Sequence, residues 1–327
     1  MANKVKISVI ASSVPAMETS VSMKPTVGKV GGYLRDQIAQ TLPDKPDLIV
    51  LPEACDRPPN FKINERFDYY RLRGNRMLET LAGIAREHHC YITYPAVRSL
   101  PDGTWRNSVQ LIDRQGRVAA IYDKYHPTIG ENEAGIMSGT DAVVAECDFG
   151  RVGFALCFDL NFDEIRQKYV KARPDLMVFC SMYHGGLMQA YWAYSGRMFF
   201  AASISGVGGF VISPVGELIA KSTNYFNYVT STVNLDYVVA HLDENWERLK
   251  AMRAKYGAKV QVFDPGYLGA VLVSSEADGI SARDMAQEFE LELLDDYFAR
   301  SLAVQTQHRN ESQAAPQDIT REIKTYK

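Results

Sequence analysis

The sequence predicts an α/β protein in which a mixed sheet, or two stacked sheets, is covered by helices. Short and almost wholly apolar runs at residues 47–51 and 175–180 are typical of strands that are covered on both faces. Stretches with apolar residues three and four positions apart separate such runs in the first half of the chain. Neighbouring strand-like runs around turn residues add antiparallel pairs, and this mixture indicates helices packed on sheets.

The elements follow from local patterns in chain order. Alternation at 5–11, and apolar or strand-like runs elsewhere, predict strands at 5–11, 47–51, 90–97, 108–113, 118–122, 141–147, 151–156, 175–180, 199–204, 209–212, 218–220, 228–233 and 267–274. Helical spacing predicts helices at 32–42, 74–89, 163–171, 187–198 and 282–302. We assign residues 1–280 to one domain, and residues 281–327 to a C-terminal helix and tail that is either mobile or in contact with another subunit.

Composition narrows the classes of function. The 327 residues are 46% hydrophobic with a net charge of −3, which allows a large core and gives no basic field for nucleic acid or for a membrane surface. The five cysteines are odd in number and scattered, without a Cys-x-x-Cys pair, so we expect a reducing, cytoplasmic location. No metal or other cofactor is expected, because the adjacent His88 and His89 would diverge by about 100° on a helix.

Cys157 lies in the bend between the predicted strand 151–156 and the helix that follows. Such a bend lifts a side chain off the sheet and directs backbone N–H groups at one point, so a thiol there can be a nucleophile beside an oxyanion site. We expect the backbone N–H of Phe158 to contribute to that site and Asn161 to cap the helix. Nearby positive charge and the helix N-terminus are expected to lower the pKa of the thiol.

Two further charged residues also follow predicted strands. Glu53 comes after the strand 47–51, and Lys124 comes after the strand 118–122. Functional groups of α/β proteins gather at strand ends. A carboxylate that accepts a thiol proton, an ammonium that stabilises an oxyanion and a thiol nucleophile form a coherent catalytic set.

These three segments resemble the nitrilase superfamily, the carbon–nitrogen hydrolases. The contexts Leu-Ile-Val-Leu-Pro-Glu53, Tyr-Asp-Lys124-Tyr-His and Cys157-Phe-Asp-Leu-Asn match the family's Glu-Lys-Cys triad in order and spacing, over roughly residues 5–240. The resemblance implies a four-layer α-β-β-α sandwich and a homodimer or higher homo-oligomer, with helices 163–171 and 187–198 as the candidate pairing face. It also implies hydrolysis of a small amide through a cysteine thioester, without a cofactor.

The resemblance implies further site residues. A second glutamate is expected between the lysine and the cysteine, with Glu133 preferred over Glu131 for its distance to Gly139. Tyr183 and His184 fall where relatives often place residues that contact substrate.

Several alternatives to amide hydrolysis remain. Phe158-Asp159 resembles the amidase-like branches, whereas nitrilases commonly have Trp-Glu at these positions, and Asn161 replaces an arginine that is frequent in amidases. The other hypotheses are an N-carbamoyl amino acid (ureido) hydrolase, a nitrilase, a papain-like pair of Cys157 with His126 or His184, and an inactive scaffold that binds an amide-like ligand.

Overall fold

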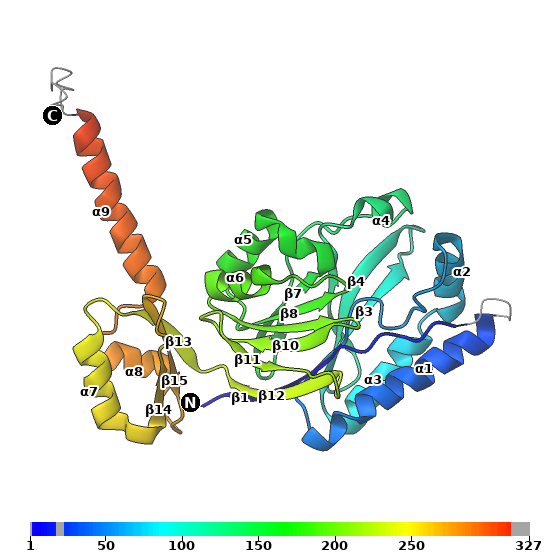
Figure 1. The fold of residues 1–327 in the computed structure, drawn as a ribbon, viewed down its shortest axis with the longest axis horizontal. Coiled ribbons are helices and arrows are strands. Elements are labelled where there is room, and N and C mark those ends of the chain that lie inside the picture. Colours follow the sequence, from blue (N-terminus) through cyan, green and yellow to red (C-terminus); the bar gives the residue numbers. More distant parts are fainter. Residues whose placement is uncertain (1, 18–22, 315–327) are drawn as a thin grey trace, which may run out of the picture.

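The computed structural model describes residues 2–17 and 23–314, and within them it contains two six-stranded sheets and one three-stranded sheet (Figure 1). The strands of the first sheet are, in spatial order, β12 (Tyr228–Asn234), β1 (Lys4–Ile10), β2 (Leu48–Val50), β3 (Tyr91–Ser99), β4 (Trp105–Ile112) and β5 (Val118–Asp123). Those of the second are β11 (Leu218–Lys221), β10 (Gly208–Ile212), β9 (Phe199–Ile204), β8 (Leu176–Ser181), β7 (Gly150–Leu156) and β6 (Val144–Cys147). The central strands β1–β2–β3 and β7–β8–β9 run parallel, and the outer pairs are antiparallel, so each sheet is mixed.

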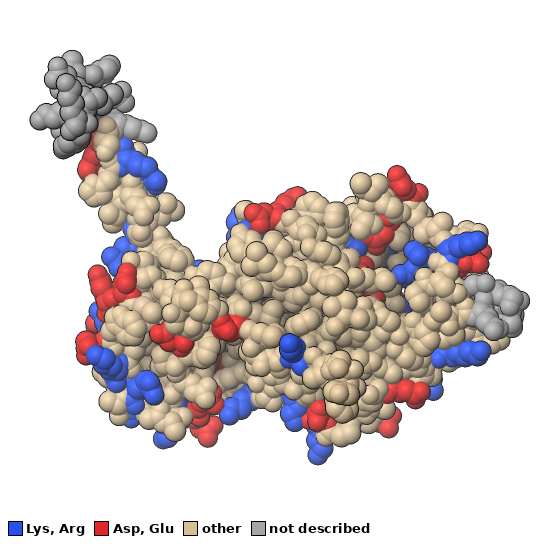
Figure 2. All heavy atoms as spheres, in the orientation of Figure 1, with Lys and Arg blue, Asp and Glu red and all other residues tan. Residues whose placement is uncertain are grey.

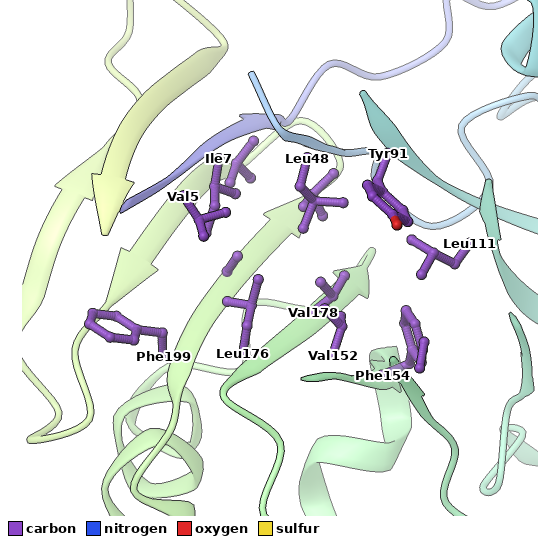
Figure 3. Close-up of a cluster of buried hydrophobic side chains, with 14 of the residues drawn as sticks. Val5, Ile7, Leu48, Tyr91, Leu111, Val152, Phe154, Leu176, Val178 and Phe199 are labelled. Carbon is purple, nitrogen blue, oxygen red and sulfur yellow. The ribbon is translucent and has the colours of Figure 1, made fainter. Parts of the chain in front are cut away.

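The two large sheets pack face to face through one hydrophobic core. Figure 3 shows Val5, Ile7 and Leu48 of the first sheet opposite Leu176 and Val178 of the second. Side chains alternate between faces along a strand, so Ile49 and Met177 point away from this core toward the helices.

Helices cover the outer face of each sheet. The helices α1 (Met23–Ala39) and α3 (Arg76–His88) bury their apolar side chains against the first sheet, and α5 (Asp163–Ala172) and α6 (Leu187–Gly196) bury theirs against the second. The four layers are therefore α-β-β-α, as expected. The first helix was predicted from residue 32, but it begins at Met23, since Val27 and Val30 extend its buried face by two turns.

Two short helices lie in the connections at one end of the sandwich, α2 (Ile63–Arg73) and α4 (Ile129–Glu133). Helix α2 was not predicted, because most of its residues are polar and it buries only Tyr69, Tyr70 and Arg73. Short 3-10 turns occupy Leu42–Asp44, Cys157–Asn161 and Gly257–Lys259. Nowhere in the described ranges does a helix have the length and apolar composition needed to cross a bilayer.

The third sheet was not anticipated as a unit, although the predicted strand 267–274 corresponds to its strand Ala270–Ser275. Its strands are β13 (Tyr237–His241), β15 (Ala270–Ser275) and β14 (Val260–Phe263), and it packs with α7 (Trp246–Tyr256) and α8 (Ala282–Glu288) around a small core of its own. This unit begins inside the range 1–280 that the sequence analysis assigned to one domain.

The C-terminal helix also differs from expectation. The predicted helix 282–302 is two helices, because the chain turns between α8 and α9 (Leu294–Ala314), with Glu290 at a φ of 51°. Helix α9 projects away from the rest of the molecule (Figure 1), and it includes residues 309–314 of the predicted tail. Residues 315–327 of that tail lie outside the described residues.

Candidate active site

Three strand ends bring the predicted triad to one cavity. Glu53 follows β2, Lys124 follows β5, and Cys157 follows β7 of the opposite sheet. All three line a cavity of about 610 Å³, a size usual for small-molecule sites. Figure 2 shows a hollow with acidic and basic side chains on its walls, in the region where Figure 1 places α2 and α4.

Lys124 lies between two carboxylates. Its Nζ is 3.1 Å from Glu53 Oε1 and 2.8 Å from Glu131 Oε2, and its side chain is 1% exposed. Burial opposes the charge of the ammonium, but Glu53 and Glu131 outweigh that effect and raise the pKa of Lys124 above its usual value. The group is therefore a fixed cation at neutral pH, suited to stabilising negative charge and unsuited to accepting a proton.

The structure places Glu131, and not the preferred Glu133, against Lys124. Thr128 and Glu131 form a capping box at the start of α4, with Thr128 as the N-cap and Glu131 at position N3. The Glu131 carboxylate accepts the Thr128 N–H at 2.8 Å, and Thr128 Oγ1 accepts the Glu131 N–H. Glu133, two residues further along this short helix, is exposed and lines the outer part of the cavity. The pattern Thr-x-x-Glu in the sequence is the signal that could have distinguished the two glutamates.

Asn107 is a site residue that the sequence analysis missed. It lies in β4, is 5% exposed, and its Nδ2 donates to Glu53 Oε1 at 3.0 Å and to Glu131 Oε1 at 2.7 Å. Its backbone carbonyl accepts the N–H of Lys124 at 2.8 Å. Asn107 thus holds both carboxylates and the lysine in fixed relative positions. A single asparagine in a strand has no sequence pattern that would have identified it.

The backbone is strained at Cys157 and at the residue that follows Glu53. Cys157 has a φ of 52°, and Ala54, next to Glu53, has a φ of 55°. Residues with a Cβ seldom occupy this left-handed region, and such strain concentrates at functional sites. The sharp turn at Cys157 directs its side chain from the end of β7 into the cavity.

The thiol of Cys157 is protonated in the resting site, contrary to the expected lowering of its pKa. Burial, together with the charge of Glu53 and a hydrogen bond to it, raises the pKa of Cys157 to about 12 despite Lys124 and the backbone N–H of Met182. The dipole of α5 does little to lower the pKa of this thiol, because Cys157 begins a 3-10 turn and α5 starts only at Asp163. A base must therefore remove the proton when the thiol attacks.

Asp159 connects the cysteine turn to the lysine loop. It is fully buried, and its carboxylate accepts hydrogen bonds from Leu156 N at 2.9 Å, Tyr122 Oη at 2.7 Å and His126 N at 2.7 Å. These donors flank Cys157 on one side and Lys124 on the other. Asp159 thereby fixes the distance between the two segments.

The other predicted contacts lie away from this cavity. Asn161 does not cap α5, since its Nδ2 donates to Phe158 O and Phe162 occupies the cap position. Tyr183 is 40% exposed and donates to Asn161 Oδ1, and His184 is also exposed. Among the described residues of this loop, Met182 is the one that lines the cavity, and its N–H donates to Glu53 Oε2 at 3.1 Å.

The histidine alternatives find no support in this geometry. The ring of His126 stacks on Phe162 with centroids 3.9 Å apart, and its Nδ1 lies 3.5 Å from Asp159. Within the described ranges, the cavity lining contains neither His126 nor His184. In the same part of the chain, no three His, Cys, Asp or Glu side chains gather as a metal ion would require.

Comparison with known sequences places the chain among hydrolases of carbon–nitrogen bonds. The family described as Carbon-nitrogen hydrolase matches residues 16–243. Human pantetheinase is 25% identical over 225 residues, which cover 65% of this chain and 43% of that protein, so the chain spans less than half of that relative. An omega-amidase of Xenopus tropicalis is 22% identical, over 58% of this chain and 78% of the relative.

Solved structures share the fold. A carbon-nitrogen hydrolase from Helicobacter pylori superposes with a TM-score of 0.61 at 14% sequence identity, and the match covers 78% of this chain and 93% of the Helicobacter chain. An amidase from Nesterenkonia gives a TM-score of 0.59 at 15% identity, covering 70% of this chain and 89% of its own. A mutant of that amidase shows the product of adding acrylamide to its active-site cysteine.

Proposed function

Because this chain belongs to the carbon-nitrogen hydrolase family, we propose that it hydrolyses a small amide at Cys157, releasing ammonia or an amine. The observation that supports this proposal most strongly is the lining of one cavity by Glu53, Lys124 and Cys157, with a thiol that needs a base and a carboxylate hydrogen-bonded to it. The amidase and omega-amidase relatives favour amides over nitriles.

In the first half-reaction, Glu53 takes the proton of Cys157 as the sulfur attacks the amide carbon. The new C–S bond converts the carbonyl oxygen to an oxyanion, which the Lys124 ammonium and the backbone N–H of Phe158 stabilise. When the C–N bond breaks, protonated Glu53 gives its proton to the leaving nitrogen. The products are a thioester on Cys157 and free ammonia or amine.

In the second half-reaction, water hydrolyses the thioester. Glu53 is ionised again and removes a proton from the water as its oxygen attacks the thioester carbon. The C–S bond then breaks, and the proton returns from Glu53 to the sulfur. Glu131 and Asn107 act as positioning residues, because they touch Lys124 and Glu53 and hold them in place.

The experiment is ammonia release from short aliphatic amides by the wild type and by Cys157→Ala. We expect the substitution to abolish hydrolysis. Cys147→Ala is the matched control, since Cys147 is also half-buried and burial likewise raises the pKa of its thiol to about 12, but it lies at the far end of β6. Hydrolysis by Cys157→Ala near the wild-type rate would overturn the proposal.

We also propose that the protein pairs with a second copy through the outer faces of α5 and α6. Leu187 is 82% exposed and Tyr191 is 39% exposed on α6, and apolar side chains of this size are common at protein interfaces. Light scattering of the purified chain tests this, with Leu187→Glu expected to shift a dimer to monomer. A monomeric wild type would contradict it.

A further inference from the structure

Arg57 is a partly buried cation in the wall of the catalytic cavity that the mechanism does not use. It follows Glu53 by four residues and lines the same cavity as Cys157. Its Nε and Nη1 are shielded from solvent and have no hydrogen-bond partner among the residues that the structure describes. Its Nη2 contacts Met182 Sδ at 3.6 Å, and a thioether is only a weak acceptor.

Burying a guanidinium without hydrogen-bond partners costs free energy. Arg73 shows how this protein pairs an arginine that has a structural role. Arg73 is 5% exposed and forms an ion pair with Asp56, and its Nη2 also donates to Val97 O at 2.6 Å. Buried charges are normally paired in this way. Nε and Nη1 of Arg57 have no such partner within the described chain, and Arg57 lines the cavity, so its guanidinium can turn toward a partner that enters from solution.

The surroundings favour an anion. Arg66 also lines the cavity, and burial together with the charge of Arg57 lowers the pKa of Arg66, so the two cations lie close enough to repel. Of the four acidic residues that line the cavity, three are paired with other cations, Glu53 and Glu131 with Lys124 and Asp56 with Arg73, and the fourth, Glu133, is exposed. This leaves a positive region on the Arg57 side of the cavity.

We propose that the physiological substrate carries a carboxylate, which Arg57 binds while the amide of the same molecule lies at Cys157. This inference rests on the proposed function and specifies its substrate class. Two classes of compound meet this description: the ω-amide of a dicarboxylic acid and an N-carbamoyl amino acid. Both place a carboxylate a few bonds from a hydrolysable C–N bond, and guanidinium groups are well suited to binding carboxylates.

The test compares kcat/KM for matched pairs of anionic and neutral substrates. Glutaramate is paired with pentanamide, and N-carbamoyl-β-alanine with propylurea, with ammonia release as the readout. We expect the wild type to prefer an anionic member, and Arg57→Met to reduce that preference by about 10- to 100-fold, mainly through KM. Which anionic member is preferred distinguishes the two classes of compound.

Four further variants complete the design. Arg57→Lys keeps the charge and should retain part of the preference, so a poorly folded Arg57→Met does not decide the result. Arg71→Met is the matched control, since Arg71 lies on α2 near Arg66, is paired with Asp68 and is 62% exposed. Calorimetry of Cys157→Ala with glutarate should show binding that the added Arg57→Met removes.

The possible failures are distinguishable. If neutral amides are hydrolysed as well as their anionic partners, and Arg57→Met lowers both equally, the assignment of Arg57 is wrong while the proposed function stands. If no member of any pair is hydrolysed, and Cys157→Ala binds no glutarate, both the proposed function and the substrate class are overturned.

Discussion

The ammonium nitrogen of Lys124 lies 2.8 Å from Glu131 Oε2, closer than its 3.1 Å to the proposed base Glu53. Two carboxylates thus share one buried cation, and Asn107 donates to both of them. In the proposed mechanism, the pairing with Glu131 keeps Lys124 in place while Glu53 holds the thiol proton and has lost its charge.

Glu131 and Glu133 should differ in their effect on catalysis. We expect Glu131→Gln to lower kcat/KM by about 10- to 100-fold, because a charge-assisted hydrogen bond to Lys124 is lost. Glu133→Gln, on the exposed side of α4, is the matched control and should change kcat/KM by less than about threefold. Equal losses in the two variants would contradict the assignment of Glu131.

The stability conferred by Glu131 should depend on pH. Burial works against its charge, but Lys124 and hydrogen bonds from Thr128 and Asn107 lower the pKa of Glu131 below its usual value of about 4.3. A lowered folded-state pKa contributes stability above the unfolded pKa, and this contribution is lost as the pH falls through the folded pKa. The difference in Tm between wild type and Glu131→Gln should therefore be constant above about pH 6 and shrink below about pH 4. A difference that grows toward acid would have the opposite sign and refute the coupling.

Removing the charge of Glu53 should separate thiolate formation from turnover. After burial, that charge is the largest cause of the raised pKa of Cys157, whereas Lys124 lowers it. In Glu53→Gln the thiol should ionise at lower pH, so the midpoint of iodoacetamide alkylation at Cys157 shifts toward neutrality while amide hydrolysis falls by about 100-fold or more. An alkylation midpoint that stays in place or rises would show that Glu53 does not face the thiol.

Asp159 should matter for stability and for catalysis together. Asp159→Ala removes a fully buried carboxylate and leaves Leu156 N, His126 N and Tyr122 Oη without their acceptor. We expect the free energy of unfolding to fall by about 3 kcal/mol or more in urea titrations, with a lower kcat in the remaining folded enzyme. Asp163→Ala is the control, because that side chain is 62% exposed and its pairing with Arg166 should contribute less than about 1 kcal/mol.

The strands and helices of the sandwich, and the positions of Glu53, Lys124 and Cys157 at strand ends, could be predicted from local patterns in the sequence, whereas the four-layer order and the triad were implied by the resemblance to the nitrilase superfamily. Buried strands such as β2 and β8 appear as apolar runs, and the residue that follows such a run is placed at the edge of a sheet. Glu53 and Cys157 each follow a strand of this kind, and Lys124 follows β5, which is more exposed, so their positions relative to the sheets required no knowledge of loops.

Features that depend on loops or on weak patterns were not accessible. The choice between Glu131 and Glu133 turns on which side of a five-residue helix faces inward, and spacing alone favoured the wrong side for contact with Lys124. In the third sheet, β15 was predicted, but β13 and β14 have only five and four residues and α7 buries only Leu249 and Met252, so these elements give no clear periodicity. The raised pKa of Cys157 arises from burial in the assembled site, which no local pattern reports.

The proposed mechanism requires that Cys157 becomes acylated during turnover. Acid quenching of the wild type within its first turnovers, followed by intact-mass and peptide analysis, tests this directly. We expect an added mass equal to the acyl group of the amide, located on Cys157 and absent from Cys157→Ala. An acyl group on a different residue, or steady hydrolysis by Cys157→Ala, would contradict it.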